Sequence, residues 1–194
     1  MRCSCARQNC SPKRLDSAFR ARGGDIPKER TVNKTNAMRM LDTRKIEYQM
    51  LEYPVRDGRI DGVSVAEKMG EPQEQVFKTL VTQSQTDRRT LFVFVIPVAE
   101  ELDLKKAAQA CGQKSVAMLP QKALLPSTGY IHGGCSPVGM KKSYPTYLDS
   151  SARQWEKIFV SGGKIGLQIR LAPIDLLRVV GGSYAPLTRE RKER

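Results

Sequence analysis

The sequence predicts a single-domain α/β protein of the mixed (α+β) kind, in which helices surround a mixed sheet or small β-barrel. With 194 residues, 40% of them hydrophobic, the chain is long enough for one full core. Segments with helical and with strand periodicity are interspersed without regular alternation, which disfavours a doubly wound parallel sheet. We expect a disordered basic leader at 1–30, one domain at 31–188 and a charged tail at 189–194.

Helix and strand signals follow one another through the first half of the domain. Thr35 is placed to cap a first helix, and an alternating strand follows it as far as Pro54. A capping-box pattern from Ser64 to Glu67 predicts a second helix, which Gly70 closes. The apolar positions of the first helix and strand are Ala37, Met38, Leu41, Ile46, Tyr48, Met50 and Tyr53.

A long β-hairpin is predicted next, with strands at 76–82 and 90–96 joined by a polar stretch. Asp103 is placed to cap a helix that ends at Gly112. Further on, short strands are expected at 146–148, 157–160 and 167–171. Pro173 suits the first turn of a last helix, which Gly181 ends.

Positive charge is the strongest feature of the composition. Of a formal net charge of +13, residues 1–30 carry +5, residues 189–194 carry +2 and the domain carries +6. This balance favours a polyanionic partner such as nucleic acid, although a merely basic, soluble surface explains it equally well. No apolar run approaches the roughly 20 residues that cross a bilayer, and no secretory signal is visible. We therefore expect a soluble, cytoplasmic protein with no membrane partner.

The five cysteines indicate neither a disulfide framework nor a metal centre. Cys111 and Cys135 stand alone in the domain, and the other three lie in the leader, at Cys3, Cys5 and Cys10. The leader triplet lacks a fourth ligand nearby, since the single histidine is far away. No phosphate-binding loop pattern is present either. We expect no metal and no cofactor.

Three features could carry chemistry. Lys78 stands in an apolar strand on the same face as Val76 and Leu80, where an ammonium must meet an anion or open into a cleft. From the strand alone, an edge lysine with its head in water is the favoured interpretation. The other two features are glycine-rich loops at 133–139 and 161–166, whose amides could hold a phosphate or an oxyanion. Tight turns explain these glycines equally well.

Conventional hydrolase machinery is not evident in the sequence. Cys135 follows His132 by three residues, but a cysteine–histidine pair normally takes its histidine from a distant segment. We therefore do not expect a nucleophilic cysteine. A serine triad lacks the Gly-x-Ser-x-Gly elbow that would carry it.

Six short motifs follow one another along the domain. They are Phe77-Lys78-Thr79-Leu80, Leu102-Asp103-Leu104-Lys105-Lys106, Ser127-Thr128-Gly129-Tyr130, Gly133-Gly134-x-Ser136-Pro137-x-Gly139, Lys141-Lys142 and Ser161-Gly162-Gly163-Lys164-x-Gly166. The ordered set resembles the bacterial YbaK/EbsC family of Cys-tRNA(Pro) deacylases, from about Thr35 to about Tyr184. The leader lies outside the resemblance.

The resemblance implies a compact mixed β-barrel and a trans-editing hydrolase that removes cysteine wrongly attached to tRNA(Pro), acting alongside prolyl-tRNA synthetase. It implies that Lys78 is catalytic and that the substrate's own thiol attacks the ester carbonyl, so that the protein supplies no nucleophile. It also implies a set of substrate-binding residues, with glycine amides lining the carbonyl pocket. These are Tyr53, Thr79, Gly133, Gly134, Ser136, Ser161, Gly162 and Gly163.

Two departures from a well-known branch of that family bear on substrate choice. Gln168 stands where that branch has an aspartate, and residues 60–62 stand where it has a phenylalanine. A deacylase for another small amino acid, such as alanine on tRNA(Pro), therefore stays open. So does a non-catalytic module that binds tRNA or the synthetase, although the retention of Lys78 and both glycine loops argues against it. The oligomeric state is left open.

Overall fold

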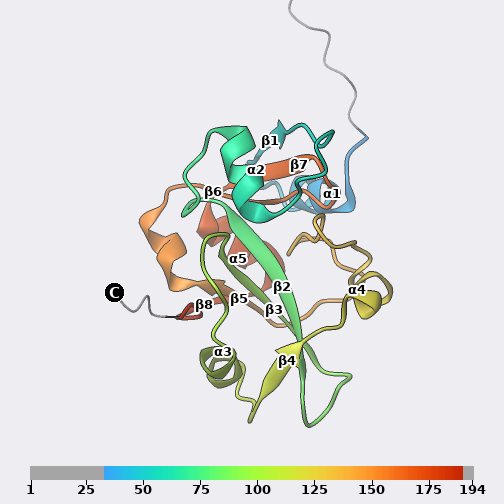
Figure 1. The fold of residues 1–194 in the computed structure, drawn as a ribbon, viewed down its shortest axis with the longest axis vertical. Coiled ribbons are helices and arrows are strands. Elements are labelled where there is room, and N and C mark those ends of the chain that lie inside the picture. The colour runs from blue at the N-terminus through green and yellow to red at the C-terminus, as the bar shows by residue number, and fades with distance from the viewer. Residues whose placement is uncertain (1–32, 190–194) are drawn as a thin grey trace, which may run out of the picture. The chain divides into compact units, whose positions relative to one another are not determined.

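The computed structural model describes residues 33–189, which form interspersed helices and strands (Figure 1). The leader with its three cysteines and most of the charged tail lie outside these residues. The helices are α1 (Asn36–Thr43), α2 (Gly62–Met69), α3 (Leu104–Ala110), α4 (Gln121–Thr128), α5 (Pro173–Val180) and a 3-10 helix (Ser150–Gln154). The strands are β1 (Gln49–Glu52), β2 (Phe77–Ser84), β3 (Leu91–Pro97), β4 (Val116–Met118), β5 (Thr146–Asp149), β6 (Ile158–Ser161), β7 (Leu167–Leu171) and β8 (Ser183–Ala185).

The strands of 33–189 form two sheets. Of the two expected arrangements, the structure has the mixed sheet and not the closed barrel. The larger sheet has the order β4-β2-β3-β5-β8 and combines antiparallel pairs with parallel ones. The smaller sheet, β1-β7-β6, is antiparallel, and an isolated bridge between Val76 and Phe159 connects the two. The prediction of a mixed α/β domain is confirmed. The predicted hairpin is the β2–β3 pair.

β3 is the centre of the core, and all seven of its residues are buried. On one face, Val93 and Val95 pack in the same cluster as α1, α5 and the smaller sheet. On the other face, Phe92, Phe94 and Ile96 pack with α3. A strand buried on both faces needs a continuous apolar run, which explains the sequence of this one. Figure 1 shows β2 and β3 running through the middle, with α2 and the smaller sheet at one end.

Two of the three predicted helix caps are confirmed, and one is wrong. Thr35 accepts a hydrogen bond from the N–H of Met38, and Asp103 accepts from the first turn of α3. The cap of the second helix lies three residues before the predicted one, because Asp61 accepts from the N–H of Ser64 at 3.0 Å. Ser64 is therefore a buried residue inside α2. An Asp carboxylate is as good a cap as a Ser hydroxyl, so the earlier cap prevailed.

The elements that sequence patterns did not predict are short. They are β4, α4, β8 and the 3-10 helix. α4 contains Pro126 and leaves Leu125 half exposed, so it shows no apolar stripe. The first helix also ends earlier than its apolar pattern indicates, since Lys45 has a φ of 55° that turns the chain. None of the helices within 33–189 has the length and apolar character needed to cross a membrane.

Candidate active site

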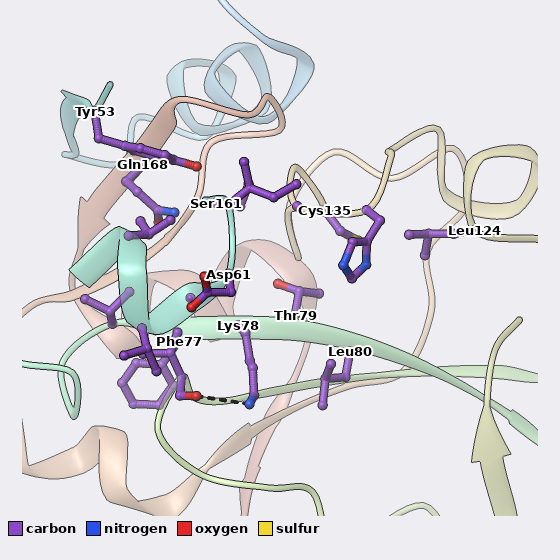
Figure 2. Close-up of a pocket in the computed structure, with 18 residues that line it drawn as sticks. Tyr53, Asp61, Phe77, Lys78, Thr79, Leu80, Leu124, Cys135, Ser161 and Gln168 are labelled. Atoms are coloured by element: carbon purple, nitrogen blue, oxygen red, sulfur yellow. Dashed lines mark hydrogen bonds between the residues drawn. The ribbon is translucent and has the colours of Figure 1, made fainter. Parts of the chain in front are cut away.

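A cavity of about 340 Å³ opens beside β2 where the two sheets meet (Figure 2). Its floor is the segment from Val76 to Leu80, and α2, the smaller sheet and the first glycine loop form its walls. Five of the predicted site residues line it: Tyr53, Lys78, Thr79, Gly133 and Ser161. These residues come from four separate segments, so the fold assembles a site that is dispersed in the sequence.

β2 has an unpaired edge where it passes the cavity. One side of the strand pairs with β3 throughout, whereas the other pairs with β4 only from Thr82 onward. The peptide groups of Val76 and Ser84 bond toward β3, and alternate residues of an antiparallel strand face opposite sides. The N–H and C=O of Thr79 therefore face the unpaired edge. The buried hydroxyl of Thr79 also has no partner within 33–189, so three of its polar groups are unpaired.

Lys78 leaves β2 on the face opposite Thr79 (Figure 2). Its Nζ donates a hydrogen bond to the carbonyl oxygen of Val98 at 3.1 Å. Burial lowers the pKa of Lys78, while Glu101 and Glu100 act in the opposite direction. Lys78 is thus a half-buried amine that lines the cavity and is hydrogen-bonded to the main chain of Val98, which lines it as well. It is not the solvated edge lysine that the strand alone favoured.

The smaller sheet contributes a cross-strand pair to the cavity wall. Ser161 of β6 lies opposite Gln168 of β7, and Figure 2 shows both beside Tyr53. Gln168 is only 6% exposed, yet its Oε1 has no hydrogen-bond partner among the described residues. A buried acceptor of this kind normally meets a donor, so a ligand in the cavity would satisfy it. The sequence identified Gln168 only as a departure from a family pattern.

Asp61 is a site residue that the sequence did not predict. Its carboxylate caps α2 and points into the cavity (Figure 2). The hydrogen bond from the Ser64 N–H lowers the pKa of Asp61, so the group is negatively charged at neutral pH. The sequence signal for this cap was Asp61-Gly62 directly before an apolar helix. Gly62 is needed here, because a Cβ would collide with the side chain of Val98.

A strap from Pro54 to Ile60 closes the cavity between Tyr53 and Asp61. Lys68 of α2 holds this strap, since its Nζ lies 2.6 Å from both Asp57 Oδ1 and the carbonyl oxygen of Arg59. At the end of the strap, Ile60 packs against Gly133, where a Cβ would lie 2.8 Å from Ile60 Cδ1. Lys68 was not singled out in the sequence, because its partners are nine and eleven residues away in an irregular segment.

Cys135 and His132 both line the cavity but do not form a catalytic pair. Burial raises the pKa of the Cys135 thiol to about 12, which keeps it protonated at neutral pH. No hydrogen bond joins it to His132 in the described part of the chain. Within 33–189 there is also no group of three or more His, Cys, Asp and Glu side chains that could hold a metal ion.

Four of the predicted binding residues lie behind the cavity wall. Ser136 is fully buried and its Oγ accepts from the N–H of Val138. The N–H of Gly134 donates to the carbonyl of Ile131, so it is already engaged. Gly162 and Gly163 do not line the cavity either. These four residues shape the loops that carry Gly133 and Ser161.

Tyr130 joins the two glycine loops. Its hydroxyl donates to the carbonyls of Val138 and Gly139 in the first loop, at 2.7 and 3.2 Å. Its ring lies under Gly163 of the second loop, where a Cβ would approach Tyr130 Cε1 to 2.8 Å. Gly163 also has a φ of 90°, which favours glycine. Close packing therefore explains Gly163.

Comparison with known proteins decides the family. The sequence matches the aminoacyl-tRNA editing domain over residues 61–179, which hold every cavity residue except Tyr53 and Ile60. The chain belongs to the aminoacyl-tRNA editing family. An Enterococcus faecalis member, provisionally named as the Cys-tRNA(Pro)/Cys-tRNA(Cys) deacylase EbsC, is 47% identical over 163 residues. Those residues are 84% of this chain and 98% of that protein.

Three further matches are more distant in sequence. The uncharacterised protein YwhH of Bacillus subtilis is 29% identical over 57% of this chain and 69% of its own length. The crystal structure of a provisional trans-editing enzyme for prolyl tRNA synthetase matches with a TM-score of 0.71 at 24% identity. It covers 80% of this chain and 96% of that one. The crystal structure of the hypothetical protein APE2540 matches with a TM-score of 0.72 at 18% identity. It covers 80% of this chain and 100% of that one. These two structures show that the fold is shared.

Proposed function

We propose that this chain is a trans-editing hydrolase that deacylates tRNA(Pro) mischarged with cysteine. Its family and the similarity to EbsC support an aminoacyl-tRNA deacylase. The mechanism is inferred from the chemical groups that line the cavity. Unpaired donors and acceptors and an amine surround it, yet the thiol that lines it is protonated. Such a site can bind and polarise an ester, but the nucleophile comes from the substrate.

The unpaired edge of β2 supplies the polarising groups. In the proposed complex, the N–H of Thr79 donates to the ester carbonyl oxygen, and the N–H of Gly133, which has no acceptor within 33–189, adds a second donor. Fixed peptide donors stabilise a developing oxyanion because they need no reorganisation. Lys78 adds a positive charge that orients the terminal ribose and stabilises the transition state.

The acceptors in the cavity suit the α-ammonium of an aminoacyl ester. Asp61 offers a carboxylate and Gln168 an unpaired Oε1, and both line the same cavity. A charge-assisted hydrogen bond to the carboxylate is stronger than one between neutral groups. We therefore assign recognition of the amino group to these two residues, with Tyr53 and Ser161 forming the adjacent wall.

The bound cysteine then supplies the nucleophile. Its thiol sulfur attacks the carbonyl carbon, the carbon–oxygen bond to the terminal ribose breaks, and the thiol proton passes to the released ribose oxygen. The products are tRNA(Pro) with a free hydroxyl and a cyclic thioester of cysteine, which water opens to free cysteine. Neither step requires a protein nucleophile, in keeping with the raised pKa of Cys135.

Purified protein offered Cys-tRNA(Pro) and Ala-tRNA(Pro) tests the proposal. We expect the cysteinyl ester to be cleaved and the alanyl ester to be spared, since alanine has no thiol. Lys78→Met keeps the aliphatic stem and removes the charge, and loss of one such group costs about 100-fold or more in rate. Lys105→Met, at an exposed lysine on α3, is the matched control and should retain full activity.

Two results would contradict this assignment. Equal rates for wild type and Lys78→Met would remove Lys78 from the mechanism. Cleavage of the alanyl ester alone would remove the substrate thiol and indicate attack by water or a ribose hydroxyl.

We further propose that the chain acts in the cytoplasm alongside prolyl-tRNA synthetase, which generates the mischarged substrate. If the two proteins bind directly, adding the synthetase should lower the KM for Cys-tRNA(Pro) without changing the rate at saturation. Equal KM values with and without synthetase would mean that the deacylase captures free tRNA.

A further inference from the structure

The surplus positive charge of the described chain is concentrated in one segment. Residues 104–148 contain six lysines and neither Asp nor Glu. The rest of 33–189 is almost neutral, with sixteen Lys and Arg against fifteen Asp and Glu. A polyanion would therefore be attracted mainly to the surface that this acid-free segment forms.

This acid-free segment reaches the candidate active site through the first glycine loop. Gly133 and Cys135 line the cavity, whereas Pro137 and Gly139 line a separate depression of about 70 Å³. Six residue steps span at most about 22 Å, so the depression and the cavity are neighbours. A ligand with a reactive end in the cavity could extend as far as the depression.

The depression is lined by two cations and no carboxylate. Arg44, at the end of α1, and Lys142 both contribute to it, together with Ser143. Both cations are exposed, and neither has an ion-pair or side-chain hydrogen-bond partner within 33–189. The acid nearest in sequence, Asp42, is engaged by Lys34 at 2.7 Å and by Tyr48. Two unneutralised cations beside a hydroxyl are the donor set of a phosphate site.

We propose that the depression at Arg44 and Lys142 binds a backbone phosphate of the RNA whose aminoacylated end occupies the cavity. This inference rests on the proposed function. On the scale of a DNA strand, which advances about 3.4 Å per nucleotide, a span of about 22 Å places the phosphate about six nucleotides from that end or nearer. Contacts of this kind fix the position of the strand and carry no sequence information.

Binding of uncharged tRNA(Pro) at increasing salt tests the site. Arg44→Gln and Lys142→Gln should each reduce the slope of log affinity against log salt by about 0.9, because each loses a phosphate contact. Between 50 and 200 mM salt, wild-type affinity should then fall about threefold more than that of either variant. Lys114→Gln is the matched control, because Lys114 is an exposed lysine of the same segment outside the depression, and it should keep the wild-type slope.

A second substrate separates this site from the cavity. Both variants should slow deacylation of subsaturating Cys-tRNA(Pro) but not of cysteinyl-adenosine, which has no internucleotide phosphate. Unchanged salt slopes in both variants, an equal loss in Lys114→Gln, or slower cleavage of cysteinyl-adenosine would each overturn the proposal. Failure of the wild type to cleave either ester would refute the proposed function instead, while the salt slopes would still report on the phosphate site.

Discussion

Asp61 shows how one side chain can serve both the fold and the site. Its carboxylate begins α2 by accepting from the N–H of Ser64, and it lines the cavity at the same time. The local pattern of the sequence favoured Ser64 as the cap, because a capping box also fits there. Which of these two cap positions, three residues apart, is used depends on packing, since Gly62 is the position that fits against Val98.

Asp61→Asn separates the two functions, because asparagine caps a helix about as well as aspartate. The variant should keep its stability and lose the charged partner of the α-ammonium, lowering kcat/KM for Cys-tRNA(Pro) about tenfold to hundredfold. Steady-state kinetics measures this loss. N-acetyl-Cys-tRNA(Pro), which has no ammonium group, is the control substrate. An equal loss on the acetylated substrate would show that Asp61 does not bind the amino group.

Cys135 predicts a specific stability change in alkali. Its pKa is about 12 in the fold and 9.0 when unperturbed, so between these values only the unfolded chain loses the proton. The free energy of unfolding should therefore fall as pH rises above 9, by up to about 1.4 kcal/mol per pH unit from this group. Urea titrations at pH 8, 9 and 10 measure the free energy of unfolding, and this free energy should fall less steeply with pH in Cys135→Ala than in the wild type. Parallel curves would mean that the thiol does not contribute.

At the scale of elements, the site depends on a strap that has no regular structure. Residues 54–60 connect β1 to α2, and Lys68 fixes them through Asp57 and the Arg59 carbonyl. Helices and strands with clear periodicity, such as β2, β3 and α5, were predicted because their apolar faces define them. The strap was not, because hydrogen bonds from Lys68 hold it and it has no apolar face, and α4 was not, because it shows no apolar stripe.

Lys68→Met should release the strap and leave α2 folded. We expect faster hydrogen exchange of the amides at 54–60 and a fall in kcat/KM of up to about 100-fold, since the cavity wall loses its position. Arg178→Met is the control, because Arg178 pairs with Asp175 on the surface of α5 and should leave activity unchanged. Unchanged exchange in Lys68→Met would show that other contacts hold the strap.

At the scale of the whole molecule, the cavity exists because two sheets meet beside an incompletely paired strand. The sequence predicted six of the eight strands in 33–189, the mixed class and five of the cavity residues. It could not predict that Ser161 lies opposite Gln168, since strand register is a tertiary property. Nor could it separate Gly133, which lines the cavity, from Gly163, which makes room for Tyr130. Both positions require glycine, and the residue type alone does not show which of the two reasons applies.

Tyr130→Phe tests whether the two glycine loops act together. The variant keeps the ring under Gly163 but leaves the buried Val138 carbonyl without its partner, which should cost about 1 to 3 kcal/mol of stability. Activity should fall as well, because Gly133 belongs to the loop that is released. Tyr144→Phe, whose hydroxyl donates to the carbonyl of Ser127, is the control and should leave kcat at saturating substrate intact. Equal effects of the two variants on kcat would argue against the coupling.

The unpaired edge of β2 also limits what conventional mutagenesis can reveal. The N–H and C=O of Thr79 belong to the main chain, so every residue except proline presents the same N–H at this position. An alanine scan would remove only the hydroxyl and would assign little importance to position 79. Replacing the amide of residue 79 by an ester, through semisynthesis, removes the N–H alone and would measure its contribution directly. Sequence variation at this position is therefore compatible with an unchanged reaction.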